Sequence, residues 1–373
     1  MPPSGGRGAE HPDSHHGYVS NEQFDRHGRS HIVRRMIAAD TDRISARLPD
    51  GYRARPFEDR DREPLVKERN AEAHPMEYQD AEEWRMWERM APDATQIRIV
   101  VEGPSAVAGT AHVGAGALMR HPDGAQNGGL SVFRADRGKG IGAALLGAIE
   151  DEAHRRGAPR LLAGASAAHP FALEWAQKRG YREIGRRIES YIELATFEPA
   201  PFAARVAEVR ASGLQLRTFA EVLEGQSDEE REAFFRAVYE AQHPIWEDVP
   251  WATRTEPWTF EQFRHMTFGT GQLIADASLI AYDGDRIAGF TTTGRRQTKD
   301  AYTWITGTTR EYRGRGIATT MKVEALSRAK AKGLRAMLTT NDEPNKAMRG
   351  INAKLGYQML PAHVQLEKNL SRS

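Results

Sequence analysis

Apolar residues recur at four-residue spacing through residues 314–332, which predicts a helix with one buried face. The residues on that face are Ile317, Met321, Ala325 and Ala329. Upstream, three runs rich in β-branched and aromatic residues predict strands at 278–282, 286–293 and 302–309. Downstream, the pattern predicts a strand at 334–340, a helix at 345–355 and a last strand around 364–366. This order of elements indicates an α+β domain with a mixed sheet.

The same pattern occurs earlier in the chain. Arg-Gly-Lys-Gly-Ile at 137–141 returns as Arg-Gly-Arg-Gly-Ile at 313–317, an offset of 176 residues. The same offset links Gly-Tyr at 180–181 with Gly-Tyr at 356–357, with no insertion between the matches. So many identities in one register indicate a duplicated domain.

The repeat predicts an N-terminal domain at 48–200 and a C-terminal domain at 212–373, joined near Pro199 and Pro201. Residues 1–47 form an extension whose first twenty residues have the composition of a disordered segment, with a possible helix from about Ser30. Its five histidines fit no metal-ligand spacing, so we predict no metal site; they are His11, His15, His16, His27 and His31.

The second copy carries ten extra residues within 245–261. The insertion holds three tryptophans next to Glu247 and Asp248, a combination that suits an ammonium-bearing substrate through cation–π contact and charge pairing. The predicted substrate-binding residues are Trp246, Asp248, Trp251 and, on the strand before the loop, Trp304. The alternative is that the tryptophans only pack a core or a domain interface.

Charge and composition exclude several classes of protein. Lys plus Arg is 52 and Asp plus Glu is 51, so no global field attracts nucleic acid or an anionic membrane. No run of about 18 apolar residues predicts a membrane span. Cysteine is absent, which excludes disulfides and thiolate chemistry. We expect a cytoplasmic protein; the oligomeric state stays open.

The duplicated loop joins a predicted strand to a predicted helix as Arg-x-x-Gly-x-Gly/Ala. Glycines allow a tight turn, and the free N–H groups of the helix N-terminus favour an anion such as pyrophosphate. The predicted cradle residues are Arg137, Gly138, Lys139, Gly140, Ile141 and Gly142 in the first copy and Arg313, Gly314, Arg315, Gly316, Ile317 and Ala318 in the second.

Three other interpretations of the loop were weighed. A Walker loop would close on Gly-Lys-Ser/Thr, which neither copy has. A dinucleotide fingerprint fails in the second copy, where Thr319 takes its last position. A plain helix start with helpful glycines is the third, and the duplication of the loop together with the downstream Gly-Tyr argues against it.

On these residues, the chain resembles the GCN5-related N-acetyltransferase (GNAT) superfamily over nearly all of both copies. The run from Asn341 through Asn345, Met348 and Asn352 to Gly356-Tyr357 is similar to the signature of mycothiol synthase-like tandem acetyltransferases of actinobacteria. The resemblance implies two tandem domains, each a mixed, mostly antiparallel twisted sheet with flanking helices. It also implies acetyl-CoA, or another acyl-CoA, as the acyl donor.

The resemblance further implies that the strand before the loop splays from its neighbour, so that the pantetheine arm lies in the gap. A backbone N–H near Thr306–Thr308 would polarise the thioester carbonyl, and an amine of a small-molecule acceptor would attack it directly. Further cofactor-binding residues on this basis are Thr306, Thr308, Asn341, Asn345 and, in the first copy, Val132.

The second copy is the predicted catalyst, because its proposed reaction edge is polar and that of the first copy is not. The second copy has Thr306, Thr308, Thr339, Asn341, Asn345 and Asn352. Subtracting 176 gives Leu130, Val132, Ala163, Ala165, His169 and Ala176.

Asn352 stands where many members of the superfamily carry a tyrosine acid, and asparagine cannot supply a proton. Tyr302 and Tyr357 are candidate replacements, and Asp300, two residues before Tyr302 on the same strand face, is a candidate base. The vacant tyrosine position also leaves a second hypothesis, a non-catalytic acyl-CoA-binding or scaffolding protein.

Overall fold

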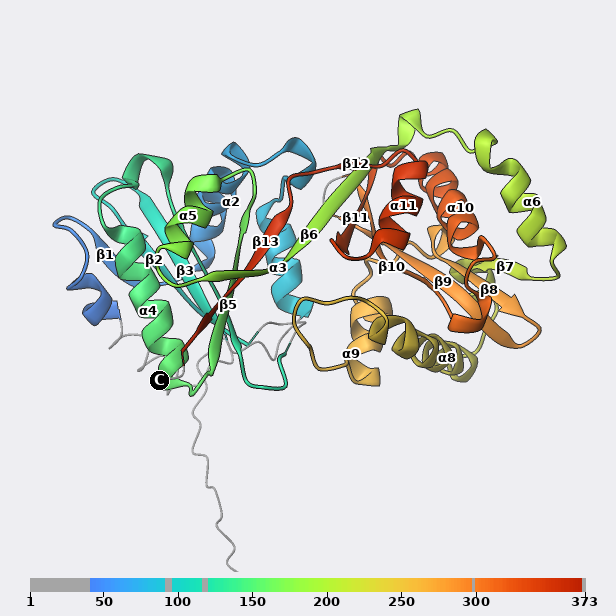
Figure 1. Ribbon diagram of the computed structural model, residues 1–373, viewed down its shortest axis with the longest axis horizontal. Helices are drawn as coiled ribbons and strands as arrows, with labels where there is room; N and C mark the ends of the chain where they lie inside the picture. The colour runs from blue at the N-terminus through green and yellow to red at the C-terminus, as the bar shows by residue number, and fades with distance from the viewer. Residues whose placement is uncertain (1–40, 91–95, 116–119, 297–298, 371–373) are drawn as a thin grey trace, which may run out of the picture.

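The computed structural model describes residues 41–90, 96–115, 120–296 and 299–370. Most of the predicted N-terminal extension, with its five histidines, lies outside them. Within these ranges the strands form one continuous sheet, and the two halves of the chain lie side by side along it (Figure 1). The strand order is β1-β2-β3-β4-β5-β13-β6-β11-β10-β9-β8-β7, with β12 paired to β6.

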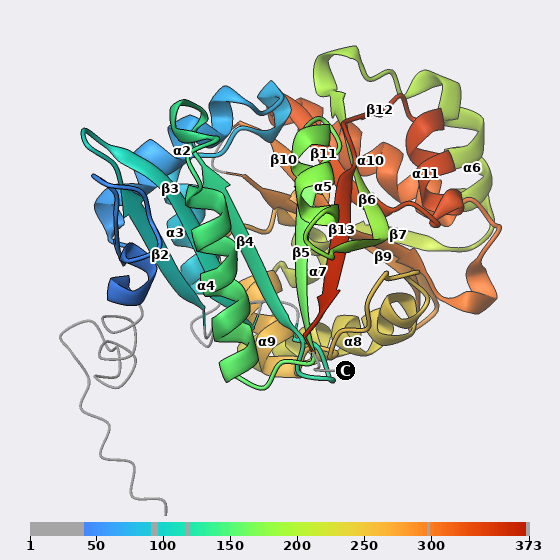
Figure 2. The ribbon, with the colours of Figure 1, turned by 60° about the vertical axis from the view of Figure 1, so that its left-hand side comes forward.

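Among the described residues, the first half supplies the strands β1 to β5 at one end of the sheet and the helices α2 to α5 around them. The strands are β1 (Arg53–Pro56), β2 (Ile97–Glu102), β3 (Val107–Gly114), β4 (Gln126–Val132) and β5 (Arg160–Ser166). The helices are α2 (Arg62–Ala71), α3 (Ala81–Met90), α4 (Ile141–Arg155) and α5 (Pro170–Gln177). Two views show α4 along the sheet of this half (Figures 1 and 2).

The second half repeats this plan at the other end. Its strands are β7 (Gln215–Thr218), β8 (Leu279–Asp283), β9 (Arg286–Arg295), β10 (Ala301–Thr308) and β11 (Ala336–Asp342). Its helices are α7 (Phe219–Leu223), α8 (Asp228–Glu247), α9 (Phe260–Arg264), α10 (Ile317–Ala331) and α11 (Lys346–Lys354). The helices and strands predicted from periodicity between residues 278 and 355 are confirmed, with ends that differ by at most three residues.

Helices cover both faces of the second half. α10 and α11 pack on one face, where Ile317, Met321 and Ala325 join a core with Leu279 and Ala281. α8 and α9 pack on the other, around Phe263 and Phe290. The four positions predicted as the buried stripe of α10 are all buried.

The last strand of the chain belongs to the sheet of the first half. β13 (His363–Asn369) lies between β5 and β6 (Arg182–Glu193) and pairs antiparallel with both; Figure 1 shows it in red between two green strands. β6 continues into the second half, where residues 187–193 pair with β11, and the short strand β12 (Gln358–Met359) also pairs with it. The sequence places β13 at the end of the second copy but does not indicate this exchange.

β13 is part of the hydrophobic core of the first half, because Val364 and Leu366 pack with Leu145, Leu161 and Tyr181. The limits 48–200 and 212–373 therefore remain a proposal for the extent of the two duplicated sequence units. They do not mark two domains with separate cores, because β13 packs in the core of the first half. The connection between them is helical in part, with α6 at Ala203–Ala211.

Leu366→Ala is expected to destabilise the protein by about 2–3 kcal/mol, because it leaves a cavity beside a buried strand. Hydrogen exchange is the informative measurement, since protection should fall in β5 and β6, almost 200 residues away in sequence. Loss of protection confined to β10 and β11 would contradict the placement of β13 between β5 and β6. Leu370→Ala is the control, because Leu370 is only partly buried and lies just beyond the end of β13.

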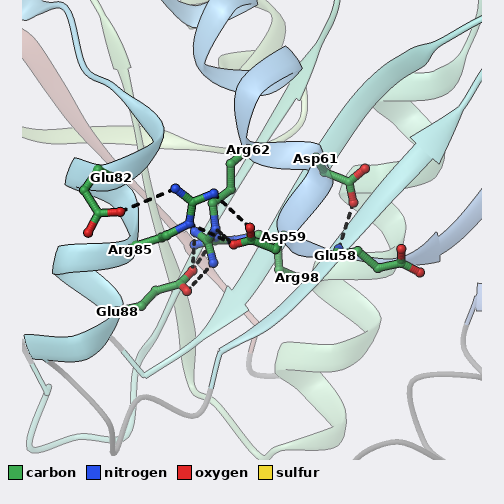
Figure 3. A network of polar contacts seen from close by, with 8 residues as sticks. All are labelled: Glu58, Asp59, Asp61, Arg62, Glu82, Arg85, Glu88 and Arg98. Carbon is green, nitrogen blue, oxygen red and sulfur yellow. Dashed lines mark hydrogen bonds and ion pairs between the residues drawn. The ribbon is translucent and has the colours of Figure 1, made fainter. Parts of the chain in front are cut away.

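Ion pairs hold the helices α2 and α3 to the sheet of the first half. The buried Arg62 donates to Asp59 (2.8 Å) and to Glu88, which also accepts from Arg98 of β2 (2.9 Å). Figure 3 shows these side chains, together with Arg85, converging between the two helices and the strand. The network fixes the direction of α2, whose C-terminal end reaches the loop of the first copy.

A buried arginine joins the two halves. Arg296, at the end of β9, donates to the carbonyl oxygens of Met76 and Tyr78 (3.0 Å each) and pairs with the buried Glu83 at 3.3 Å. All three partners come from the segment around α3. The segment around α3 in the first copy and the end of β9 in the second therefore meet through these polar contacts.

Two negative findings concern the described residues alone. No helix among them has the length and apolar character needed to cross a bilayer. No cluster of three or more His, Asp or Glu side chains in the same ranges is arranged to hold a metal ion.

Candidate functional site

Both predicted loops end in the same backbone geometry. Gly316 caps α10 with φ of 81°, and Gly140 caps α4 with φ of 88°. These left-handed conformations favour glycine because a Cβ atom would be strained there. Ile317 and Ile141, which follow, are buried in the two cores and anchor the first helical turns. Each helix therefore begins at a fixed loop with its free N–H groups available to an anion.

The first arginine of each loop bonds to neighbouring residues and so holds the loop in place. Arg313 donates from Nε to the carbonyl oxygen of Thr308 (3.3 Å) and pairs with Asp248 at 2.5 Å. Arg137 makes the equivalent bond to the carbonyl oxygen of Val132 (3.1 Å) and pairs with Glu72. Asp248 and Glu72 are the residues at the C-terminal ends of the helices α8 and α2 respectively.

Asp248, a predicted substrate ligand, is thus engaged by two arginines, since Arg310 also donates to it at 2.6 and 3.0 Å. These bonds hold the pKa of its carboxyl well below the usual range. A carboxylate that is bonded to two arginines holds the loop in position. It has little hydrogen-bonding capacity left to bind the acceptor amine.

The second cation of the loop distinguishes the two copies. Lys139 pairs with Asp136 at 2.7 Å, and Tyr52 donates to the same carboxylate oxygen. In the second copy Tyr312 replaces Asp136, and Arg315 replaces Lys139. Within the described part of the chain no carboxylate pairs with Arg315, whose guanidinium lies 5.0 Å from the Tyr312 ring. The first loop is neutralised by its own side chains, and the second keeps a free positive charge.

A gap opens in the sheet beside the second loop. β10 pairs with β11 only from Ala301 to Thr303, although it stays paired with β9 as far as Thr308. The N–H of Thr309 points to β9, where it donates to Ala288 at 3.0 Å. Because successive N–H groups of a strand point to opposite sides, those of Thr308 and Thr306 point into the gap. The first copy has the same gap, since β4 pairs with β5 only at Gln126 and Asn127.

Polar side chains line the gap on the face covered by α10 and α11. Asn352 donates to Asn341 at 2.7 Å, and Thr306 bonds the buried Thr291 at 2.6 Å. Asn345 caps α11 by accepting from the N–H of Met348. Of the predicted polar edge, Asn341 and Asn352 are therefore in direct contact, and Thr306 and Asn345 bond to other neighbours.

Lys322 of α10 lies on the same face and was not identified from the sequence. Its side chain is 2% exposed, its ammonium nitrogen lies 5.2 Å from the ring of Tyr357, and burial lowers its pKa to about 7. Burial also raises the pKa of Tyr357, which therefore stays protonated. The offset of 176 places Leu146 at this position in the first copy, so comparing the copies at core positions would have found it.

The opposite face of the gap carries the other predicted residues. Tyr302 bonds the hydroxyl of Thr340 at 2.5 Å, and burial raises its pKa to about 12. The ring of Trp304 packs on Gly294. Trp246 lies 4.7 Å from Trp251 and 5.8 Å from Trp258, ring centre to ring centre. The half-buried tryptophans of the insertion therefore form one aromatic cluster on the α8–α9 side of the gap.

Asp300, a candidate base, is placed differently. It is 1% exposed and accepts two hydrogen bonds from Arg335, at 2.8 and 2.6 Å. It precedes β10 at the end away from the loop. The structure therefore does not bring Asp300 together with the gap, and we do not carry it into the mechanism.

Asp300→Asn is expected to lower stability by about 1–2 kcal/mol, because it weakens a charge-assisted pair, and to leave kcat within about threefold. Thermal unfolding and steady-state rates separate these effects. A large loss of kcat with unchanged stability would return Asp300 to the list of catalytic residues.

A cavity of about 600 Å³ lies elsewhere, beside α4 in the first half. Ile97, Ile99, His112, Ile149 and Arg155 contribute to its lining. It contains none of the predicted site residues, so we do not regard it as the site of the chemistry.

Comparison with known proteins agrees with the geometry. Residues 63–181 and 235–357 each match the family described as "Acetyltransferase (GNAT) family". No match was found among curated protein sequences.

Two solved structures are similar over most of their length. A GCN5-related N-acetyltransferase from Sphaerobacter thermophilus has 24% identity and a TM-score of 0.67, covering 87% of this chain and 98% of its own. A tandem GNAT protein from the clavulanic acid biosynthesis pathway has 20% identity and a TM-score of 0.66, covering 86% and 99%. At these identities the likeness establishes the fold, a two-domain arrangement included. The mycothiol synthase-like detail stays a prediction.

Proposed function

The chain belongs to the acetyltransferase (GNAT) family, and from this membership we propose that its second copy transfers an acetyl or other short acyl group from acyl-CoA to the amine of a small molecule. The observation that carries the proposal is the gap between β10 and β11. It adjoins a loop with a free cation and is lined by polar side chains that the first copy lacks.

The residues present fit acyl-CoA in the second copy. The glycine-capped N-terminus of α10 and Arg315 would hold the pyrophosphate, and the N–H groups of Thr306 and Thr308 would bond the pantetheine arm and the thioester carbonyl. Acyl-CoA supplies an activated acyl group on sulfur. The chain's part is to align that group with the acceptor and to stabilise the negative charge that develops on oxygen.

The first copy fits acyl-CoA poorly. Its loop cation is neutralised by Asp136. Aromatic side chains of α5 lie beside the loop and the first turn of α4, since a Cβ atom at Gly142 would meet Trp175 at 3.5 Å and Phe171 lies 5.1 Å from the guanidinium of Arg137. We propose that this copy is degenerate and serves the second copy structurally.

Lys322 and Tyr357 lie next to each other on the α10 side of the sheet. A lysine with a pKa near neutrality can give a proton to the thiolate and regain it from solvent. We propose these two groups for the acid role that Asn352 cannot fill. Tyr302, bonded to Thr340 on the other face, would contact the acceptor instead.

The proposal is tested by titrating acetyl-CoA into the protein calorimetrically and by following thiol release with a panel of amines. One binding event per chain and amine-dependent thiol release are expected. Binding without thiol release from any amine would favour a non-catalytic acyl-CoA-binding protein. Absence of binding would refute both functions.

A further inference from the structure

Three charged side chains face the acceptor side of the gap at the point where the two copies share strands. β6, from the first copy, pairs with β11 of the second, and the register places Glu189 opposite Thr340 and Arg187 opposite Asp342. Thr340 binds Tyr302 on the α8–α9 side. Since alternate residues of a strand share a face, Asp342 lies on that same side, as do its cross-strand neighbours.

These three groups have no side-chain partners of their own. Within the described part of the chain, no hydrogen bond or ion pair to another side chain engages the carboxylates of Glu189 and Asp342 or the guanidinium of Arg187. Asp342 is 4% exposed, and its Oδ1 is buried without a partner, as is Nε of Arg187. Leaving such atoms unbonded is costly, so their presence beside a gap indicates groups reserved for a ligand.

The two other arginines near the trio form their hydrogen bonds with other groups. Arg296 is committed to Glu83, and Arg69 donates to the carbonyl oxygen of Glu77 at 2.8 Å. Glu77 and His363 are the remaining titratable groups that face this region, with Tyr302 from β10. Burial raises the pKa of both Glu189 and Asp342. Arg296, Arg69 and Arg187 oppose this rise at Glu189, and Arg187 opposes it at Asp342.

One cation and two carboxylates therefore remain beside the aromatic cluster. Trp251 lies 6.0 Å from the guanidinium of Arg187, and Ala252 contacts Gly185 on the same strand. The insertion of the second copy thus closes over β6 of the first. A ligand held here meets aromatic rings on one side and opposite charges on the other.

We propose that the acceptor is an amine that also carries a carboxylate, and that its site is shared between the copies. Arg187 binds the carboxylate, and Glu189 and Asp342 face the amine. This inference rests on the proposed function and adds the substrate class to it. Asp342, on the strand that borders the gap, is the base.

The chemistry balances without a further reagent. The neutral amine nitrogen attacks the thioester carbon, the N–C bond forms, and the nitrogen gives one proton to Asp342. The C–S bond breaks, and its electron pair leaves with sulfur as a thiolate. The thiolate then takes up one proton, and Asp342 releases one to solvent.

The test compares amino acids with the amines that lack their carboxylate, using thiol release with saturating acetyl-CoA. Arg187→Gln should raise KM for the amino acids roughly 30-fold and change KM for the matching amines far less, because a charge-assisted pair is lost only for the former. Arg186→Gln is the control. Arg186 is the neighbour of Arg187 on β6, points to the other face and pairs with Glu183.

Asp342→Asn tests the base. It should lower kcat roughly 100-fold for every accepted amine without weakening acetyl-CoA binding. If simple amines release thiol and amino acids do not, or if Arg187→Gln shifts both KM values equally, the inference is wrong while the proposed function stands. If no amine releases thiol, the proposed function itself has failed.

Discussion

Arg315→Glu is expected to weaken acetyl-CoA binding by a factor on the order of 10²–10³, and Lys139→Glu, its counterpart in the first copy, to change it less than about twofold. Reversing the free cation of the second loop replaces attraction for the pyrophosphate with repulsion at the helix N-terminus. Lys139 is already neutralised by Asp136. Titration calorimetry of both variants provides the comparison.

The two changes are matched, since both residues are exposed and both occupy the same position of the duplicated loop. Neither should alter folding, which circular dichroism would verify. Loss of binding in Lys139→Glu, with binding retained in Arg315→Glu, would make the first copy the acyl-CoA site. Equal losses in both would mean that the two loops bind together.

Lys322→Met is expected to stabilise the protein by about 3–5 kcal/mol at neutral pH while lowering kcat. Burial lowers the pKa of Lys322 from 10.5 to about 7, and 3.5 pKa units correspond to a penalty on the order of 4–5 kcal/mol. Methionine fills a similar volume without a charge to desolvate. Denaturant unfolding measures the gain, and thiol release measures the loss of the proposed acid.

The pH dependence follows from the direction of this shift. Below about pH 7 the folded and unfolded states both carry the proton, so the full penalty applies to the wild type. Between pH 7 and 10.5 only the unfolded state stays protonated, and the penalty declines as pH rises. The advantage of Lys322→Met should therefore be at its full value at and below about pH 7 and vanish by about pH 10.5.

The first copy offers the reciprocal control. Leu146 occupies the position of Lys322 and is buried, so Leu146→Lys should destabilise the protein by a similar amount. If Lys322→Met were no more stable than the wild type at pH 7, Lys322 would have a partner that relieves its burial. If stability rose and kcat did not fall, the acid role would belong to Tyr357 alone.

The parts of the site that depend on local backbone geometry could be predicted from the sequence. Positive φ at Gly140 and Gly316 is a property of glycine, and a helix start after it presents free N–H groups in any fold. The duplicated register also separated a polar edge from an apolar one. In the structure two residues of that edge, Asn341 and Asn352, bond to each other.

The roles of the charged residues were harder to predict from the sequence than the backbone geometry of the loops. Asp248 and Asp300 are both predicted site residues. In the structure Asp248 is bound by Arg310 and Arg313, 62 and 65 residues away, and Asp300 is bound by Arg335, 35 residues away. Lys322 was not predicted as a site residue, because a lysine in a helical pattern is ordinarily exposed to solvent. The role of a charge depends on its partners, which neither spacing nor composition specifies.

The sequence by itself determined the two copies, their helices and strands, and the glycine-capped loops, because each follows from periodicity or from the conformational limits of single residues. Only the tertiary structure decided that β13 lies in the first half and that β6 joins the second. Strand pairing is non-local, and the alternation within a strand is the same whichever neighbour it has. The trio of Arg187, Glu189 and Asp342 exists only through that pairing, so no pattern along the chain could reveal it.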